Sequence, residues 1–213
     1  MLEKMDAFFE ARLEGYDDHM RTAIEGALEF YPFTAAQLPG GHILDLGCGT
    51  GLELEYYVNQ NPEAAVTGID LSAGMLSALR EKLPQENITL IQGSYFELPL
   101  GENRYDAAVS VESLHHFTQE AKSALYARLH RALKDGGYFI LTDYFAPDDA
   151  YEAFYFQEFH RLKTEQGIAG NIFCHYDTPL TVEHETEALR SGGFSKVDIL
   201  KRWGATYCLR AWK

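Results

Sequence analysis

The hydrophobic positions along the chain follow two patterns that change near residue 40. Over the first 38 residues, apolar side chains such as Met5, Phe9 and Leu13 recur at roughly helical spacing among charged ones, which predicts two short helices. From Gly41 onward, short apolar runs end at Gly or Asp and are followed by helical stretches, as expected for buried parallel strands and their crossover helices. The predicted strands are residues 42–46, 65–69, 88–92, 107–111 and 138–142, with helices at 52–61, 73–82 and 121–133.

The last third of the chain departs from this alternation. Residues 148–167 form an aromatic and charged helical stretch, and residues 182–191 form a helix that ends at two glycines. Residues 196–200 and 206–212 predict a hairpin around Gly204. Strand and helix units in this order predict an α/β fold with a Rossmann-like, doubly wound sheet and right-handed crossovers. We expect seven mostly parallel strands with a C-terminal antiparallel strand pair.

The composition is that of an ordinary globular protein, with 46% hydrophobic and 23% charged residues. Lys and Arg total 18 against 32 Asp and Glu, and this net negative charge disfavours a nucleic-acid partner. The charged N-terminus predicts no signal peptide and no apolar run reaches membrane-spanning length, so we expect a cytoplasmic protein. Cys48, Cys174 and Cys208 lie far apart, which predicts reduced thiols and no metal site.

The segment ILDLGCGTG at residues 43–51 ends a strand and opens a helix. Its glycines permit positive φ and close approach of a ligand, and the free amides at a helix start favour electronegative groups. A dinucleotide fingerprint would need a glycine where this chain has Leu52, which disfavours a nicotinamide-dependent oxidoreductase. Asp45, just before the glycines, suits an ammonium group better than a pyrophosphate. S-adenosylmethionine (SAM) has an α-amino group and no phosphate.

The ends of the second and third predicted strands add polar groups that fit the same ligand. Asp70, nineteen residues beyond Gly51, stands where a carboxylate can accept both ribose hydroxyl protons. The third strand ends where an adenine would lie, and Leu71 and Met75 offer apolar contact to its ring. The residues at that strand end are Gly93, Ser94 and Tyr95.

Five segments in order resemble the class I SAM-dependent methyltransferase family, in particular its small-molecule, ubiquinone-biosynthesis-like branch. They are ILDLGCGTG, GIDLS, QGSYFELPL, YDAAVSVESLHHF and LKDGGYFILTDY, across roughly residues 40–145. The resemblance implies that Asp70 binds the ribose and that Ser94 stands where the family often has Asp. It places the following residues around the methionine portion: Asp45, Gly47, Cys48 and Gly49.

The same resemblance implies where the reactive end of the cofactor lies. Val111 and Glu112, at the end of the fourth strand, pass beneath the sulfonium, and Tyr16 in the N-terminal helices reaches the methionine end. The implied reaction is in-line transfer of the SAM methyl group to a small-molecule acceptor, with S-adenosylhomocysteine as product and no metal. The protein then mainly aligns the reactants and excludes water.

An acceptor hydroxyl or amine needs a group that removes its proton. The candidates at the ends of strands four and five are His115, His116, Asp143 and Tyr144, among which we favour His116. The same residues could instead be structural histidines and turn caps. Cys174 and His175 are adjacent and so point apart, which argues against a nucleophile and base pair.

We expect a single domain over residues 1–213, with a helical N-terminal cover over 1–38 and a lid insertion over 146–180. Five aromatic residues in nine positions, within 151–159, are spread around one helix rather than along one face. This pattern predicts either a lid or a homodimer contact. Two alternatives to a small-molecule methyltransferase stay open: a SAM-binding or SAM-modifying protein without methyl transfer, and a tRNA-modifying methyltransferase.

Overall fold

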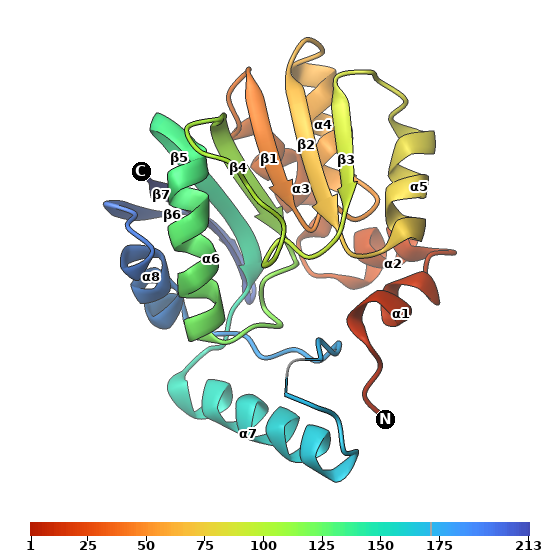
Figure 1. The fold of residues 1–213 in the computed structure, drawn as a ribbon, viewed down its shortest axis with the longest axis vertical. Coiled ribbons are helices and arrows are strands. Elements are labelled where there is room, and N and C mark those ends of the chain that lie inside the picture. Colours follow the sequence, from red (N-terminus) through yellow and green to blue (C-terminus); the bar gives the residue numbers. More distant parts are fainter. Residues whose placement is uncertain (171) are drawn as a thin grey trace.

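The computed structural model describes residues 1–170 and 172–213, and its centre is one seven-stranded sheet (Figure 1). The strand order is β3-β2-β1-β4-β5-β7-β6. Strands β1 to β5 are parallel, whereas β7 is antiparallel to both β5 and β6. The bounds are β1 (His42–Leu46), β2 (Ala65–Asp70), β3 (Ile88–Gln92), β4 (Tyr105–Val111), β5 (Leu133–Tyr144), β6 (Lys196–Trp203) and β7 (Thr206–Trp212). This topology confirms the predicted fold class.

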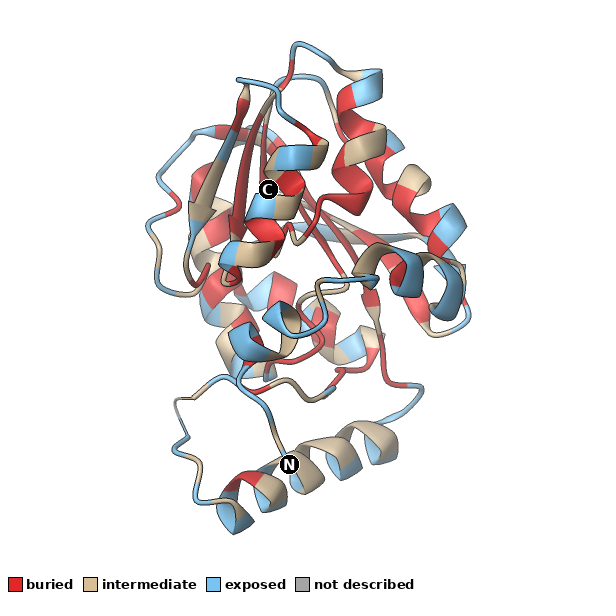
Figure 2. Ribbon diagram, turned by 90° about the vertical axis from the view of Figure 1, so that its right-hand side faces the viewer, coloured by how far each residue is buried: buried red, intermediate tan, exposed pale blue. Residues whose placement is uncertain are grey.

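The sheet is buried on both faces because its strands are apolar at successive positions. Ile43 and Val109 face one hydrophobic cluster, whereas their neighbours Leu44 and Ala108 face the other. Helices α3, α4 and α5 cover the first cluster and α6 and α8 the second, so the buried residues line the inner side of each layer (Figure 2). These helices are α3 (Ala27–Ala36), α4 (Leu52–Gln60), α5 (Ala73–Lys82), α6 (Gln119–Ala132) and α8 (Val182–Ser191).

The N-terminal 38 residues contain three helices, where the hydrophobic spacing predicted two. They are α1 (Met5–Glu10), α2 (Tyr16–Ala23) and α3. Gly15 and Gly26, with φ of 78° and 80°, interrupt the helical run because the left-handed conformation turns the backbone out of the helix. A Cβ at Gly26 would lie 2.5 Å from the Cβ of Trp203. These breaks let α3 pack against the sheet while α1 and α2 lie near the carboxyl ends of the strands.

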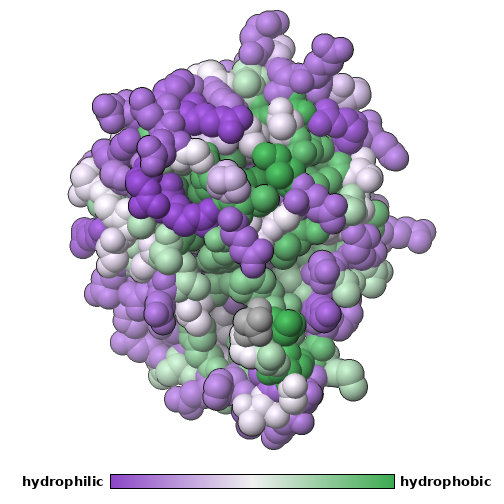
Figure 3. Space-filling model, viewed as in Figure 1, coloured by the Kyte–Doolittle hydropathy of each residue, from purple (hydrophilic) through white to green (hydrophobic). Residues whose placement is uncertain are grey.

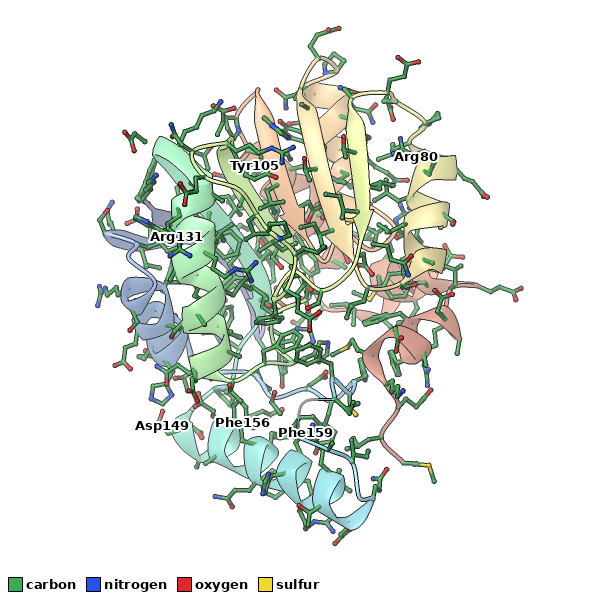
Figure 4. The ribbon with its side chains drawn as sticks, in the orientation of Figure 1. Arg80, Tyr105, Arg131, Asp149, Phe156 and Phe159 are labelled. Atoms are coloured by element: carbon green, nitrogen blue, oxygen red, sulfur yellow. The ribbon has the colours of Figure 1, made fainter. Side chains whose placement is uncertain are left out.

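Helix α7 (Asp149–Glu165) stands apart from the sheet, beyond the carboxyl ends of its strands (Figure 1). It rests on the segment that follows it, where the Phe159 ring stacks on Tyr176 with 5.3 Å between centroids. The Tyr144 and Tyr151 hydroxyls share a hydrogen bond that joins the end of β5 to this helix. Figure 4 shows Phe156 and Phe159 along α7. Most of its aromatic side chains are half-buried, but Phe154 is 58% exposed.

One side of the molecule combines apolar surface in its middle with polar surface around it. In the view of Figure 3, hydrophobic side chains gather in the middle of the surface and hydrophilic ones lie mostly around its edge. In the part of the chain that the structure describes, no helix has both the length and the hydrophobicity to cross a membrane.

Candidate active site

The turn between β1 and α4 carries the three alternating glycines, with φ of +76° at Gly47, +49° at Gly49 and +76° at Gly51. Residues with a Cβ rarely adopt this left-handed backbone conformation. A Cβ at Gly47 would lie 2.1 Å from the Ser113 Oγ, whereas nothing lies within 4 Å of the Cβ position at Gly49. The turn therefore presents bare backbone to open space, as close approach by a ligand requires.

Asp70 ends β2 directly beside this turn. Its Oδ2 accepts a hydrogen bond from the Gly49 N–H at 2.9 Å, and its Oδ1 accepts one from the Ser72 N–H at 2.8 Å. Burial raises the pKa of Asp70, although the backbone amides that it binds act to lower it. Each oxygen of an ionised carboxyl group has a further lone pair, so Asp70 can still accept from two ligand hydroxyls.

Nine of the fourteen predicted cofactor residues line one cavity, which we call the first cavity. They are Tyr16, Gly47, Gly49, Asp70, Leu71, Met75, Tyr95, Val111 and Glu112. The rest of its wall consists of His116, which the sequence predicted as a catalytic candidate, and of four residues that were not anticipated: Met5, Phe9, Ser113 and Phe117. The cavity is narrow, at about 60 Å³, because α1 and α2 close over it. The glycine turn, Asp70 and the end of β4 thus meet at one place.

Five predicted cofactor residues do not line this cavity, namely Asp45, Cys48, Gly51, Gly93 and Ser94. Asp45 is fully buried, and among the described residues neither of its carboxylate oxygens has a hydrogen-bond partner. Burial, reinforced by the nearby Glu53, raises the pKa of Asp45 well above its usual value. Cys48 Sγ packs against Gly68, within the core. Contact between the Asp45 carboxyl group and a cofactor therefore stays a prediction.

A larger space, which we call the second cavity, opens beside the first and has a volume of about 810 Å³. Its wall combines side chains of α1 and α2 with the ends of β4 and β5, the hairpin between β6 and β7, and the segment that follows α7. No described side chain of α7 itself lines it. Four residues line both cavities: Phe9, Tyr16, Glu112 and His116. A ligand in one cavity therefore lies next to a ligand in the other.

His115 and Asp143 form a buried pair at the edge of the second cavity. The His115 Nδ1 lies 2.6 Å from Asp143 Oδ1, and Asp143 Oδ2 accepts a hydrogen bond from the Leu114 N–H at 2.8 Å. Burial alone would lower the pKa of His115, but the Asp143 carboxylate outweighs it and raises this pKa to about 10. The pair is thus an imidazolium held by a carboxylate. The two sequence candidates are brought together, but Asp143 contacts His115 rather than the cavity.

His175 and Asp177 are site residues that the sequence did not reveal. Asp177 Oδ1 lies 3.3 Å from His116 Nδ1, and the His175 ring lies 4.8 Å from the His116 ring. Burial and the charge of His115 lower the pKa of His116, which keeps its imidazole neutral near pH 7. His175 was considered only together with Cys174, which is buried and does not line the cavity. Only the fold brings this segment beside the end of β4.

Glu112 has an unusual backbone and an unusual charge environment. Its φ of 48° is rare for a residue with a side chain, and such conformations cluster at active sites and ligand-binding positions. Burial, together with the negative charge of Asp143, raises the pKa of Glu112 to about 8. Its carboxyl group accepts a hydrogen bond from Thr206 Oγ1 at 3.1 Å. Glu112, which the sequence predicted to lie near the sulfonium, is therefore a residue with a constrained backbone, and it lines both cavities.

Comparisons with known proteins agree with this geometry. A family model described as a methyltransferase domain matches residues 43–137. An uncharacterized methyltransferase of Synechocystis is 34% identical over 52% of this chain and 50% of its own length. The fatty-acid O-methyltransferase of Mycolicibacterium smegmatis is 30% identical over 55% of this chain and 43% of that protein. This chain thus spans about half the length of these two curated relatives.

A solved structure extends the likeness to most of the fold. The SAM-dependent methyltransferase from Mesorhizobium loti aligns with 85% of this chain and 96% of its own, with a TM-score of 0.62 and 25% identity. The segment matched by the family model contains the glycine turn, Asp70 and the end of β4 with Glu112. Over residues 43–137 the chain is thus similar to methyltransferase domains, and the solved structure that it resembles over most of its length is a SAM-dependent methyltransferase.

Proposed function

We propose that this chain binds SAM in the first cavity and transfers the methyl group to a small molecule in the second. One observation carries the proposal: Phe9, Tyr16, Glu112 and His116 line both cavities, so donor and acceptor would meet at these residues. Methyl transfer depends on such alignment, because the reacting atoms must lie in line and in close contact. The homodimer, the ubiquinone-like branch and the cytoplasmic location stay predictions from the sequence.

The first cavity has the groups that SAM requires. The bare backbone at Gly49 admits close approach, the Asp70 carboxylate can accept the ribose hydroxyls, and Leu71 and Met75 offer apolar surface for the adenine. When bound, SAM supplies a methyl group already activated on a sulfonium. The protein therefore contributes binding, orientation and exclusion of water rather than a nucleophile of its own.

In the second cavity, charge is arranged around the place where an acceptor would lose its proton. The neutral His116 has its Nδ1 beside Asp177 and the Tyr176 carbonyl, so its Nε2 is free to accept a proton. The imidazolium of His115, held by Asp143, would stabilise the negative charge that develops on an acceptor oxygen. Tyr144 also lines this cavity and can orient the acceptor.

Isothermal titration with SAM, S-adenosylhomocysteine and NAD tests the proposed cofactor. We expect the first two to bind and NAD not to bind. A release assay for S-adenosylhomocysteine against a panel of metabolites and tRNA then tests the reaction. SAM binding without any turnover would favour a SAM-binding protein that transfers no methyl group. Turnover with tRNA alone would show that the methyl acceptor is tRNA rather than a small molecule. Binding of NAD but not SAM would refute the proposal.

Replacement of His116 by asparagine should lower kcat roughly 100- to 10,000-fold, the usual contribution of a positioned general base. The rate of S-adenosylhomocysteine release with the acceptor found in the panel measures this effect. His19→Asn provides a matched control, since His19 lines the same cavity but does not belong to the histidine and carboxylate cluster. Equal rates for the wild type and the His116 variant would show that His116 is not the general base.

The N-terminal helices should move when the cofactor binds. The first cavity encloses about 60 Å³, whereas small-molecule sites usually enclose roughly 300–1,000 Å³. Helix α1 is held over it by Glu10, whose Oε1 accepts hydrogen bonds from the Ser72 hydroxyl at 2.9 Å and the Gly74 N–H at 2.8 Å. We therefore propose that residues 5–23 open to admit SAM and close over it.

Hydrogen exchange measures this closure. The amides of residues 5–23 should exchange roughly tenfold more slowly with saturating S-adenosylhomocysteine than without it, because the ligand shifts the population toward the closed form. The buried amides of β4 serve as the internal reference for global stability. Unchanged exchange in α1 and α2, with full ligand occupancy, would contradict a moving cover.

A further inference from the structure

Two imidazoles and a carboxylate meet at the wall of the second cavity. His115 Nε2 lies 3.5 Å and His116 Nδ1 lies 3.3 Å from the same oxygen, Asp177 Oδ1. One ligand atom from each of the three residues lies within 4.8 Å of the others. Adjacent ligands of a tetrahedral zinc, with bonds of about 2.0–2.1 Å, are roughly 3.3 Å apart. The two distances to Asp177 thus match the spacing of ligands around one ion.

We propose that His115, His116 and Asp177 bind a divalent first-row transition cation, with Zn²⁺ as the best fit. Two imidazoles and one carboxylate are ligands that zinc prefers, and three protein ligands leave an open coordination position, as in catalytic rather than structural zinc sites. All three residues line the second cavity, and the Asp177 side chain is 49% exposed. An ion can therefore enter from the cavity and keep its open position toward it.

The surroundings of His115 are those of a metal ligand. Imidazole ligands usually donate their second N–H to a carboxylate, a backbone carbonyl or a water, which fixes the ring and its tautomer. The Asp143 carboxylate receives that hydrogen bond at His115 Nδ1 and is itself held by the Leu114 amide, so Nε2 is left to face Asp177. A second group, Glu112, His115 and Asp143, suits an ion less well because its one imidazole nitrogen, His115 Nδ1, lies only 2.6 Å from Asp143 Oδ1. In the proposed site His116 Nδ1 gives up only the longer contact with the Tyr176 carbonyl, at 3.2 Å.

Binding of the ion changes which atoms carry protons. Each imidazole must ligate through an unprotonated nitrogen, so His115 Nε2 releases its proton to solvent, and the His116 proton leaves Nδ1 for Nε2. His116 can then no longer accept the acceptor's proton. In this loaded state the cation would bind the acceptor oxygen and favour its deprotonated form instead. This catalytic role rests on the proposed function, whereas binding of the ion does not.

The test uses the full chain, dialysed against a chelator and then freed of it. Titration calorimetry with ZnCl₂ should show one equivalent bound, and Co²⁺ should give the intense visible absorption of a four-coordinate site. Asp177→Asn should weaken Zn²⁺ binding at least tenfold, and Asp143→Asn, which removes the partner of His115, should weaken it roughly 10- to 100-fold. His19→Asn should bind Zn²⁺ like the wild type, since it lines the same cavity outside the cluster.

The outcomes separate this inference from the proposed function. Titration with S-adenosylhomocysteine shows that each variant is folded and that its first cavity is intact. The inference is overturned if the wild type binds no Zn²⁺ while it binds S-adenosylhomocysteine, or if Asp177→Asn binds Zn²⁺ as tightly as the wild type and His19→Asn. Zn²⁺ binding that depends on Asp177, without any affinity for SAM, would instead refute the proposed function and leave the metal site standing.

Discussion

Replacement of Asp70 by alanine is expected to weaken the binding of SAM and S-adenosylhomocysteine by roughly 10- to 150-fold. Hydrogen bonds to a charged group contribute about 1.5–3 kcal/mol, and this carboxylate is the group that would accept the ribose hydroxyls. It is also placed for that role, because the Gly49 and Ser72 amides orient both of its oxygens. Isothermal titration calorimetry measures the change in Kd directly.

Two further variants separate recognition of the ribose from a general effect on the turn. Asp70→Asn keeps the size of the side chain but loses the charge and one acceptor oxygen, so its affinity should fall between those of alanine and the wild type. Asp135→Asn removes a carboxylate whose side chain is fully exposed and should leave the affinity unchanged. If Asp70→Ala binds SAM as tightly as the wild type with an unchanged Tm, Asp70 does not hold the ribose.

Replacement of Lys122 by methionine is expected to lower the free energy of unfolding by about 3–5 kcal/mol. Lys122 Nζ lies 2.5 Å from Glu185 Oε2, and both side chains are almost completely buried between α6 and α8. Tyr126 also donates a hydrogen bond to Glu185. Removal of the lysine leaves a buried carboxylate without its counter-charge, which costs far more than the loss of an exposed ion pair. Chemical denaturation measures this difference.

Two controls test whether the unpaired charge is the cause. The double variant Lys122→Met with Glu185→Leu removes both charges, so it should recover most of the lost stability. Arg161→Ala breaks the ion pairs of Arg161 with Glu158 and Glu165 on the outside of α7, and it should cost less than about 1 kcal/mol. A double variant no more stable than the single one would mean that lost packing, rather than the lone carboxylate, dominates.

Most of the fold could be predicted from local pattern. Each predicted strand lies inside an observed one, since buried parallel strands are continuous apolar runs and need no knowledge of their partners. The error in the N-terminal region has a local reason. Hydrophobic spacing marks helical segments but does not locate breaks between them, and the packing of Gly26 against Trp203 depends on a residue far along the chain.

The predicted site residues come together in the structure where one turn or one strand end decides their position, and their contact with a cofactor stays a prediction. Gly47, Gly49 and Asp70 line the first cavity because the turn and the neighbouring strand end are short-range features. Asp45 is different. Whether its side chain points to the ligand or into the sheet depends on strand orientation and on the packing of α4, and in the structure it lies buried beside Glu53.

The sequence by itself determined the sheet, the glycine turn and the similarity to methyltransferases, because each of these depends on residues that are contiguous in the chain. The second cavity, and the cluster of histidines and carboxylates in its wall, could be found only from the tertiary structure. His175 and Asp177 lie about sixty positions after His115 and His116, and they become neighbours because the chain returns from α7 across the carboxyl ends of β4 and β5. A contact of that sequence separation depends on how the elements pack, and no local spacing of residue types encodes it.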